Sequence, residues 1–93
     1  MTAVLREMLL SANEFVRRDI AEILGMIGGA HAVAILTDLL QDEVRVRYAA
    51  VEALGRISDP QTIPALKRML WDQESWIRNA AATALGRLGV APK

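Results

Sequence analysis

The chain has 93 residues, of which 53% are apolar, a composition that suits one small folded domain and excludes intrinsic disorder. Eleven basic residues balance eleven acidic ones, so no net charge draws the protein toward nucleic acid or an anionic membrane. The absence of cysteine excludes disulfides, thiol nucleophiles and thiolate metal sites.

Helical segments separated by tight turns follow one another along the chain. Residues 2–10 predict a short helix, and residues 16–27 a second one, in which apolar side chains recur every three or four positions until Gly28-Gly29 ends it. Further helices are expected at 31–41, at 45–57, at 62–71 with Pro64 in its first turn, and at 76–88. In the helix expected at residues 16–27, the side chains that should point inward are Val16, Ile20, Ile23, Leu24 and Ile27.

One helix motif occurs three times, at residues 16–27, 46–57 and 77–88, and each copy ends in a Leu-Gly pair followed by one residue and then isoleucine or leucine. Agreement at this many positions over a period of 30 or 31 residues indicates internal duplication. Units of two helices cannot bury both faces alone, so they stack. We therefore predict an all-α fold, a short right-handed α-solenoid of about six antiparallel helices in one domain. The repeat boundaries are a half repeat at 1–12, repeats at 14–42 and 44–73, a half repeat at 75–89 and a tail at 90–93.

The middle copy, Val46-Arg47-Tyr48-Ala49-Ala50-Val51-Glu52-Ala53-Leu54-Gly55-Arg56-Ile57, precedes an Asp-Pro turn and a second leucine-rich helix. This pattern resembles the HEAT-like repeat of the phycobilisome-lyase type, over almost the whole chain. The resemblance implies the fold, whereas for function it points to lyase-chaperones, adaptors and nucleic-acid enzymes alike. Its deoxyhypusine hydroxylase branch carries paired His-Glu iron ligands. No His-Glu dipeptide occurs here, so the sequence argues against that branch.

Polar residues give little support for catalysis. His31 is the only histidine and sits at the start of a helix, where we interpret it as a surface residue. The arginines that recur at positions 17, 47 and 78 predict an internal ladder, each bonding carbonyls or carboxylates of a neighbouring turn such as those of Asp42 or Asp72. We accordingly predict no catalytic residue, no metal ligand and no cofactor, and a protein that is not an enzyme.

A partner surface is expected on the second helix of each repeat, which normally lines the concave side of a solenoid. Trp71 follows the buried Leu70 and should be at least partly exposed, as an interface anchor would be. Trp76, directly before the third copy of the repeated motif, is interpreted as structural. The candidate partner-binding residues are Arg6, Glu7, Thr37, Asp38, Gln41, Lys67, Arg68 and Trp71.

This mixed-charge surface predicts a non-enzymatic protein–protein interaction module. The alternatives are a lyase-like or chaperone-like auxiliary subunit and a nucleic-acid-binding module, the last disfavoured by the zero net charge. Residues 1–43 hold three basic and seven acidic residues, and residues 44–93 hold eight and four, so the two ends of the stack could pair as a homodimer. Apolar runs of only a few residues and the lack of a leader-like segment predict a cytoplasmic protein without membrane contact.

Overall fold

The computed structural model describes residue 7 and residues 12–90, and within them the protein is built of helices without strands. Its longer helices are α2 (Glu14–Ile27), α3 (Gly29–Leu39), α4 (Val44–Ile57) and α6 (Ser75–Arg87). A 3-10 turn, η1 (Pro60–Thr62), leads into the short helix α5 (Ile63–Met69). The prediction of an all-α repeat fold is confirmed. The helix expected at residues 2–10 lies outside the described residues except for Glu7, which is helical.

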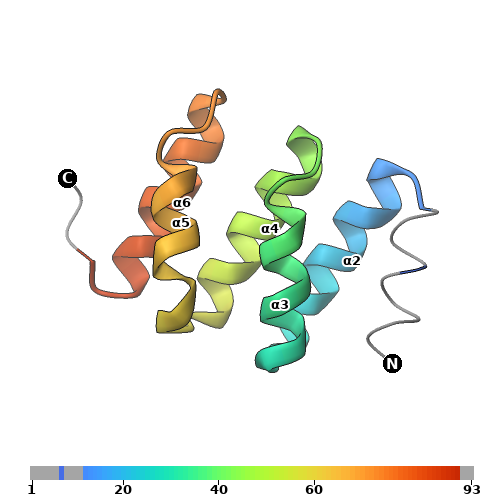
Figure 1. The fold of residues 1–93 in the computed structure, drawn as a ribbon, viewed down its shortest axis with the longest axis horizontal. Coiled ribbons are helices and arrows are strands. Elements are labelled where there is room, and N and C mark those ends of the chain that lie inside the picture. The colour runs from blue at the N-terminus through green and yellow to red at the C-terminus, as the bar shows by residue number, and fades with distance from the viewer. Residues whose placement is uncertain (1–6, 8–11, 91–93) are drawn as a thin grey trace.

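The helices form two layers (Figure 1). Helices α2, α4 and α6 lie side by side in one layer, whereas α3 and α5 cover them from the other side. We call α2, α4 and α6 the first helices and α3 and α5 the second helices. This alternation is the stack of an α-solenoid, with α2 toward one end and α6 at the other.

Local chemistry explains where the helices begin and end. The side chain of Asn13 accepts a hydrogen bond from the backbone N–H of Val16 at 3.0 Å, and Glu43 does the same for Arg45, so two first helices begin at acceptors for their free N–H groups. Helix α2 ends at Gly28, whose φ of 72° lies in the left-handed region that favours glycine. The predicted break at Gly28-Gly29 is thus confirmed, although α3 begins directly after it.

The core runs between the two layers. Its largest fully buried side chains include Leu36, Leu54, Leu66 and Ile77, one each from α3, α4, α5 and α6. Ala50 and Ala53 of α4 and their counterparts Ala81 and Ala84 of α6 are buried as well, and their small side chains allow these helices to approach closely.

One part of the predicted core is wrong. Val16, Ile23 and Ile27 were expected to point inward, but 44%, 51% and 71% of their surfaces are exposed. The residues in the same column as Val16, namely Val46 and Ile77, are fully buried because α4 and α6 each follow another first helix in the stack. Helix α2 has no such neighbour before it among residues 12–90, so only Ala21, Leu24 and Gly25 are buried in it.

Candidate functional site: a groove between the first helices

Two arginine–aspartate pairs hold the first helices in register. Arg17 in α2 donates two hydrogen bonds to the carboxylate of Asp42, Nε to Oδ2 at 2.9 Å and Nη2 to Oδ1 at 2.8 Å. Arg47 in α4 repeats this arrangement with Asp72, at 2.9 and 3.1 Å. The partners stand 25 residues apart in both pairs. Arg78 in α6 donates from Nη1 to the carbonyls of Asp72 and Gln73, so the predicted ladder is confirmed at all three arginines. We call each arginine–aspartate pair a rung.

The second rung is the more buried one, because the side chain of Asp72 is 8% exposed and that of Asp42 is 19% exposed. Burial would raise the pKa of the Asp72 carboxyl. The hydrogen bonds from Arg47 and from the Glu74 backbone N–H, together with the charges of Arg47 and Arg78, outweigh burial and lower that pKa below its ordinary value. Asp72 is therefore ionised at neutral pH and holds its arginine firmly.

The first helices touch at glycine–alanine contacts. A Cβ atom placed on Gly25 would lie 2.7 Å from the Cβ of Ala53, and one placed on Gly55 would lie 2.8 Å from the Cβ of Ala84. Both distances are shorter than any ordinary carbon–carbon contact. Glycine at these two positions is therefore what lets neighbouring first helices approach as closely as they do.

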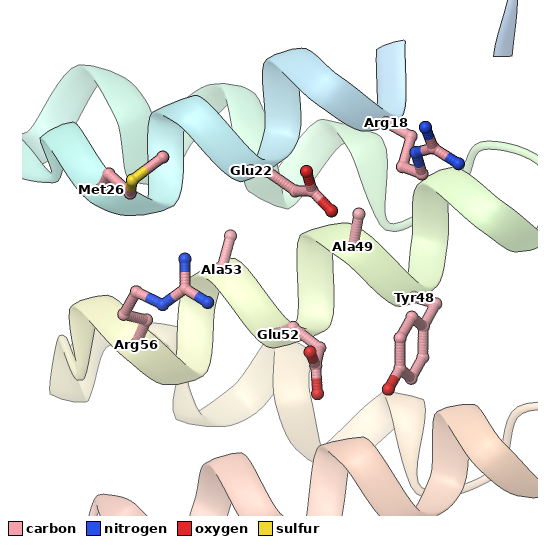
Figure 2. A pocket seen from close by; sticks show the side chains of 8 residues that line it. All are labelled: Arg18, Glu22, Met26, Tyr48, Ala49, Glu52, Ala53 and Arg56. Atoms are coloured by element: carbon pink, nitrogen blue, oxygen red, sulfur yellow. The ribbon is translucent and has the colours of Figure 1, made fainter. Parts of the chain in front are cut away.

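Above the first of these contacts, α2 and α4 enclose a groove of about 450 Å³ (Figure 2). Its floor is apolar, formed by Ala49 and Ala53 of α4, and Met26 lies at one end. Two carboxylates, one from each helix, line its middle. The polar lining residues are Arg18, Glu22, Tyr48, Glu52 and Arg56.

The positive charges of the groove are engaged unequally. Arg18 donates from Nε and Nη2 to the Asp19 carboxylate at 3.3 and 3.1 Å, and its guanidinium lies 5.6 Å from the centre of the Phe15 ring. Arg56 has no ion pair among residues 12–90. In Figure 2 the two arginines lie toward opposite ends, with Glu22 and Glu52 between them. The groove thus offers an acidic middle flanked by guanidinium groups.

Tyr48 forms the wall toward α6. Its ring packs on that of Trp76, with the ring centres 5.1 Å apart and the planes tilted by 45°. The negative charge of nearby Glu52 raises the pKa of the Tyr48 hydroxyl above its ordinary value, with burial adding to the effect. The hydrogen bond between the hydroxyl and the Glu52 carboxylate raises this pKa further. The structural interpretation of Trp76 agrees with this contact and with its 3.1 Å hydrogen bond from Nε1 to Glu74.

The groove contains none of the residues that the sequence nominated for partner binding. Thr37 and Asp38 lie in α3, and Gln41 follows it. The hydroxyl of Thr37 donates a hydrogen bond to the backbone carbonyl of Val33 at 2.7 Å. Lys67 and Arg68 are exposed in α5, and Trp71, just beyond it, is 86% exposed as expected. Glu7 is exposed and helical, and Arg6 lies outside the described residues. A binding role for this second-helix surface stays a prediction.

Sequence reasoning missed the groove because its residues fall in variable columns of the repeat. Glu22 and Glu52 do share a column, and both lie on the outer surface of a first helix, which was a usable signal. Figure 2 shows Glu22 between α2 and α4 and Glu52 on the side of α4 that faces α6, and this arrangement of the two glutamates about Ala49 and Ala53 depends on how the helices stack.

The groove does not fit a metal ion. Across residue 7 and residues 12–90, no group of three histidine, cysteine, aspartate or glutamate side chains comes together in a way that could hold one. His31 is exposed in the first turn of α3 and does not line the groove. The His-Glu iron ligands associated with one branch of HEAT-like proteins therefore have no counterpart in this part of the chain.

Comparison with known families agrees with the fold. The family model for HEAT repeats matches residues 43–93, and that for the PBS lyase HEAT-like repeat matches residues 16–42. The chain belongs to the HEAT-repeat family. The resemblance drawn from the repeated motif is thereby confirmed.

Several curated proteins named deoxyhypusine hydroxylase are similar to this HEAT-repeat chain. The protein from Eremothecium gossypii is 39% identical over 72 residues, which make up 74% of this chain and 22% of the relative. The Mus musculus protein is 34% identical over 80 residues and the Homo sapiens protein 36% identical over 79, covering 83% and 82% of this chain and 26% of each relative. The chain spans about a quarter of the length of these relatives.

These similarities correct two expectations. The prediction of a non-enzymatic interaction module is wrong, because the relatives are enzymes by name. The argument against the deoxyhypusine hydroxylase branch also fails, since the similarity extends to that branch although the chain has no His-Glu dipeptide. The absence of a ligand motif therefore does not exclude a relationship.

Among the described helices, none combines the length with the apolar character that crossing a lipid bilayer would require.

Proposed function

We propose that this chain contributes substrate-binding surface to an enzyme of the deoxyhypusine hydroxylase type, and that the α2/α4 groove is the surface that binds. The relatives' name supports the class of substrate. The single observation that carries the proposal is the pair of carboxylates, Glu22 and Glu52, across an apolar floor. No hydroxylation step is assigned to the described residues, because they bring no metal-ligand cluster together.

The chemistry of the groove suits such a substrate. Deoxyhypusine is a lysine side chain lengthened by an aminobutyl group, and its two amines are protonated at neutral pH and separated by methylene groups. Ammonium groups are recognised by carboxylates, here Glu22 and Glu52, and the methylene stem suits the alanine floor. The exposed Arg56 supplies donors for the carbonyls of the peptide that carries the side chain.

The test is a titration of the full chain with a short peptide whose central lysine carries an aminobutyl group. The matched control peptide carries the same aminobutyl-lysine with both of its amines acetylated, which removes both ammonium charges and keeps the methylene stem. Binding is followed by amide chemical shifts, and we expect the shifts to cluster at residues 18–26 and 48–56. We expect the double variant Glu22→Gln/Glu52→Gln to bind about tenfold more weakly or worse, since each charge-assisted bond is worth about 1.5–3 kcal/mol.

Asp38→Asn serves as the control variant, because Asp38 is an exposed carboxylate on the second-helix surface. It should bind the aminobutyl peptide with wild-type affinity. Equal binding of both peptides would remove the amine from the proposal. A loss in Asp38→Asn with the groove double variant unchanged would transfer binding to the surface predicted from sequence.

A further inference from the structure

Trp76 lies outside the groove, yet its contacts lead directly to one of the groove's carboxylates. It is the second residue of α6, and 42% of its surface is exposed. Its ring packs on that of Tyr48, with the ring centres 5.1 Å apart. Tyr48 lines the groove, and its hydroxyl donates a hydrogen bond to the carboxylate of Glu52, one turn further along α4. A side chain of α6 is therefore joined to Glu52 through a single tyrosine.

The indole of Trp76 is also held at its nitrogen. Its Nε1 donates a hydrogen bond to Oε1 of Glu74 at 3.1 Å. The backbone N–H of Glu74 donates in turn to Oδ1 of Asp72 at 3.0 Å, and the same oxygen accepts from Arg47 at 3.1 Å. The indole is thereby attached to the more buried rung. Because the indole is fixed in this way and packs on Tyr48, it restricts the rotation of the tyrosine ring.

The two groove carboxylates differ in this respect. Glu52 lies four residues after Tyr48, and the same two columns of the repeat hold Glu22 and Arg18 in α2. Arg18 donates to Asp19, and among residues 12–90 no ion pair holds Glu22. Figure 2 shows the side chains of Tyr48 and Glu52 on the same side of α4, directed toward α6. Glu52 is therefore the oriented carboxylate, and Glu22 is the one that can adjust.

We infer that Trp76 is a positioning residue of the groove, which acts through Tyr48 to set the orientation of the Glu52 carboxylate. The hydroxyl occupies one acceptor site of that carboxylate, and the remaining sites are left for a protonated amine. Orientation in advance favours binding, because the ligand does not have to immobilise the side chain itself. The effect on amines rests on the proposed function, whereas the effect on Tyr48 and Glu52 does not.

The first test therefore uses the protein without ligand. Tyr48 is the only tyrosine of the chain, so the ultraviolet absorbance of tyrosinate reports its pKa alone. The charge of Glu52, burial and the hydrogen bond from the hydroxyl to Glu52 all raise that pKa. Glu52→Gln should lower it toward the ordinary tyrosine value of about 10. Trp76→Ala should lower it too, and by more in wild type than in Glu52→Gln, because only in wild type does loss of the indole also loosen the contact with Glu52.

Two further variants serve as controls for this titration. Trp76→Phe keeps a ring against Tyr48, so it should restore most of the pKa shift that Trp76→Ala loses. Trp71→Ala removes the other tryptophan, which is 86% exposed and does not line the groove, and it should leave the pKa unchanged. Circular dichroism over the same pH range checks that each variant stays helical. Equal shifts from Trp76→Ala in wild type and in Glu52→Gln would overturn the inference, since Trp76 would then only shield the tyrosine from water.

The second test repeats the titration with the aminobutyl-lysine peptide and its doubly acetylated control. Trp76→Ala should weaken binding of the charged peptide about three- to tenfold, the loss expected from one hydrogen bond. Tyr48→Phe keeps the ring and removes the hydroxyl, so it should cause a similar loss. The loss from Trp76→Ala should persist in Glu22→Gln, disappear in Glu52→Gln and be largely recovered in Trp76→Phe.

The two tests separate the inference from the proposed function. A loss of binding from Trp76→Ala that is as large in Glu52→Gln as in wild type would overturn the inference. Equal binding of the two peptides by wild type, with the tyrosine titration as expected, would remove the proposed function and support the positioning of Glu52 by Trp76.

Discussion

The α2/α4 and α4/α6 interfaces are held by the same kinds of contact and differ in the side chains exposed next to those contacts. Both have an arginine–aspartate rung and a glycine–alanine contact. Only the first carries an acid pair, because the column that holds Glu22 and Glu52 holds Thr83 in α6. The arginines and glycines of these contacts thus fix the spacing of the helices, whereas neighbouring positions on the same helices differ between the two interfaces.

The aromatic contacts of the two interfaces differ as well. Trp76 covers Tyr48 at the start of α6, whereas Phe15 at the corresponding place in α2 lies under the guanidinium groups of Arg18 and Arg45. Aromatic residues in one column therefore have different partners.

Removing a rung should have the largest effect. We expect Arg47→Met to lower the free energy of unfolding by about 2–4 kcal/mol, because it leaves the buried Asp72 carboxylate without its partner. Urea unfolding measures the change. Arg17→Met is the matched variant and should cost less, since Asp42 is the more exposed acid. A larger loss for Arg17→Met would reverse the ranking of the two rungs.

Filling the close contact between Gly55 and Ala84 should have the next largest effect on stability. Gly55→Ala places a Cβ 2.8 Å from that of Ala84 and 3.2 Å from its Cα, so we expect overpacking to cost about 1–3 kcal/mol. Gly86→Ala is the control, because a Cβ atom on Gly86 would have nothing within 4 Å. It should stabilise the protein by about 0.5–1 kcal/mol, since alanine favours the helix over glycine. If both changes stabilised the protein, the first helices could not be as close as described.

The aromatic wall should contribute less. A double-mutant cycle with Tyr48→Ala and Trp76→Ala is expected to give a coupling energy of about 0.5–1.5 kcal/mol, as for other tilted aromatic pairs. The corresponding cycle between Phe15 and Tyr48 serves as the control. A coupling near zero for Tyr48 and Trp76 would mean that the wall is not formed in solution.

Acid should weaken the second rung gradually. Asp72 has a lowered pKa in the folded protein, so its stabilising contribution is complete above the ordinary aspartate pKa of about 4 and is lost as the pH falls through the lower folded value. The free energy of unfolding of wild type should therefore fall between pH 5 and pH 2 by more than that of Asp72→Asn. Comparing the two variants isolates Asp72 from Glu14, whose raised pKa, caused mainly by its hydrogen bond with Glu43, acts in the opposite direction. Parallel pH curves would contradict this role.

The contacts that hold the helices together could be predicted from sequence because the residues that make them repeat. The ladder, the glycine breaks and the helix register all follow from columns that recur every 30 or 31 residues, and a pattern seen three times is hard to misread. The errors lie where one copy departs from the others. Val16 shares its column with two buried residues, yet it is exposed because burial depends on a neighbouring helix and not on the residue alone.

The groove could not be predicted in the same way. Its acidic middle needs Glu22 and Glu52 from different repeats, and its width depends on how closely Gly25 approaches Ala53. Periodicity supplies neither. The second-helix residues were favoured because solenoids commonly bind partners there, a general tendency that says nothing about where this chain places an apolar floor between two carboxylates.

The constant separation within each rung also bears on how the protein folds. Every rung joins residues 25 positions apart, so the chain closes the same modest loop at each step. Rates of folding depend on the sequence separation of contacts more than on the number of contacts made. A polypeptide lengthened by further units of this kind would close no longer loops, and the search for its native contacts would stay as short as that of a single repeat pair.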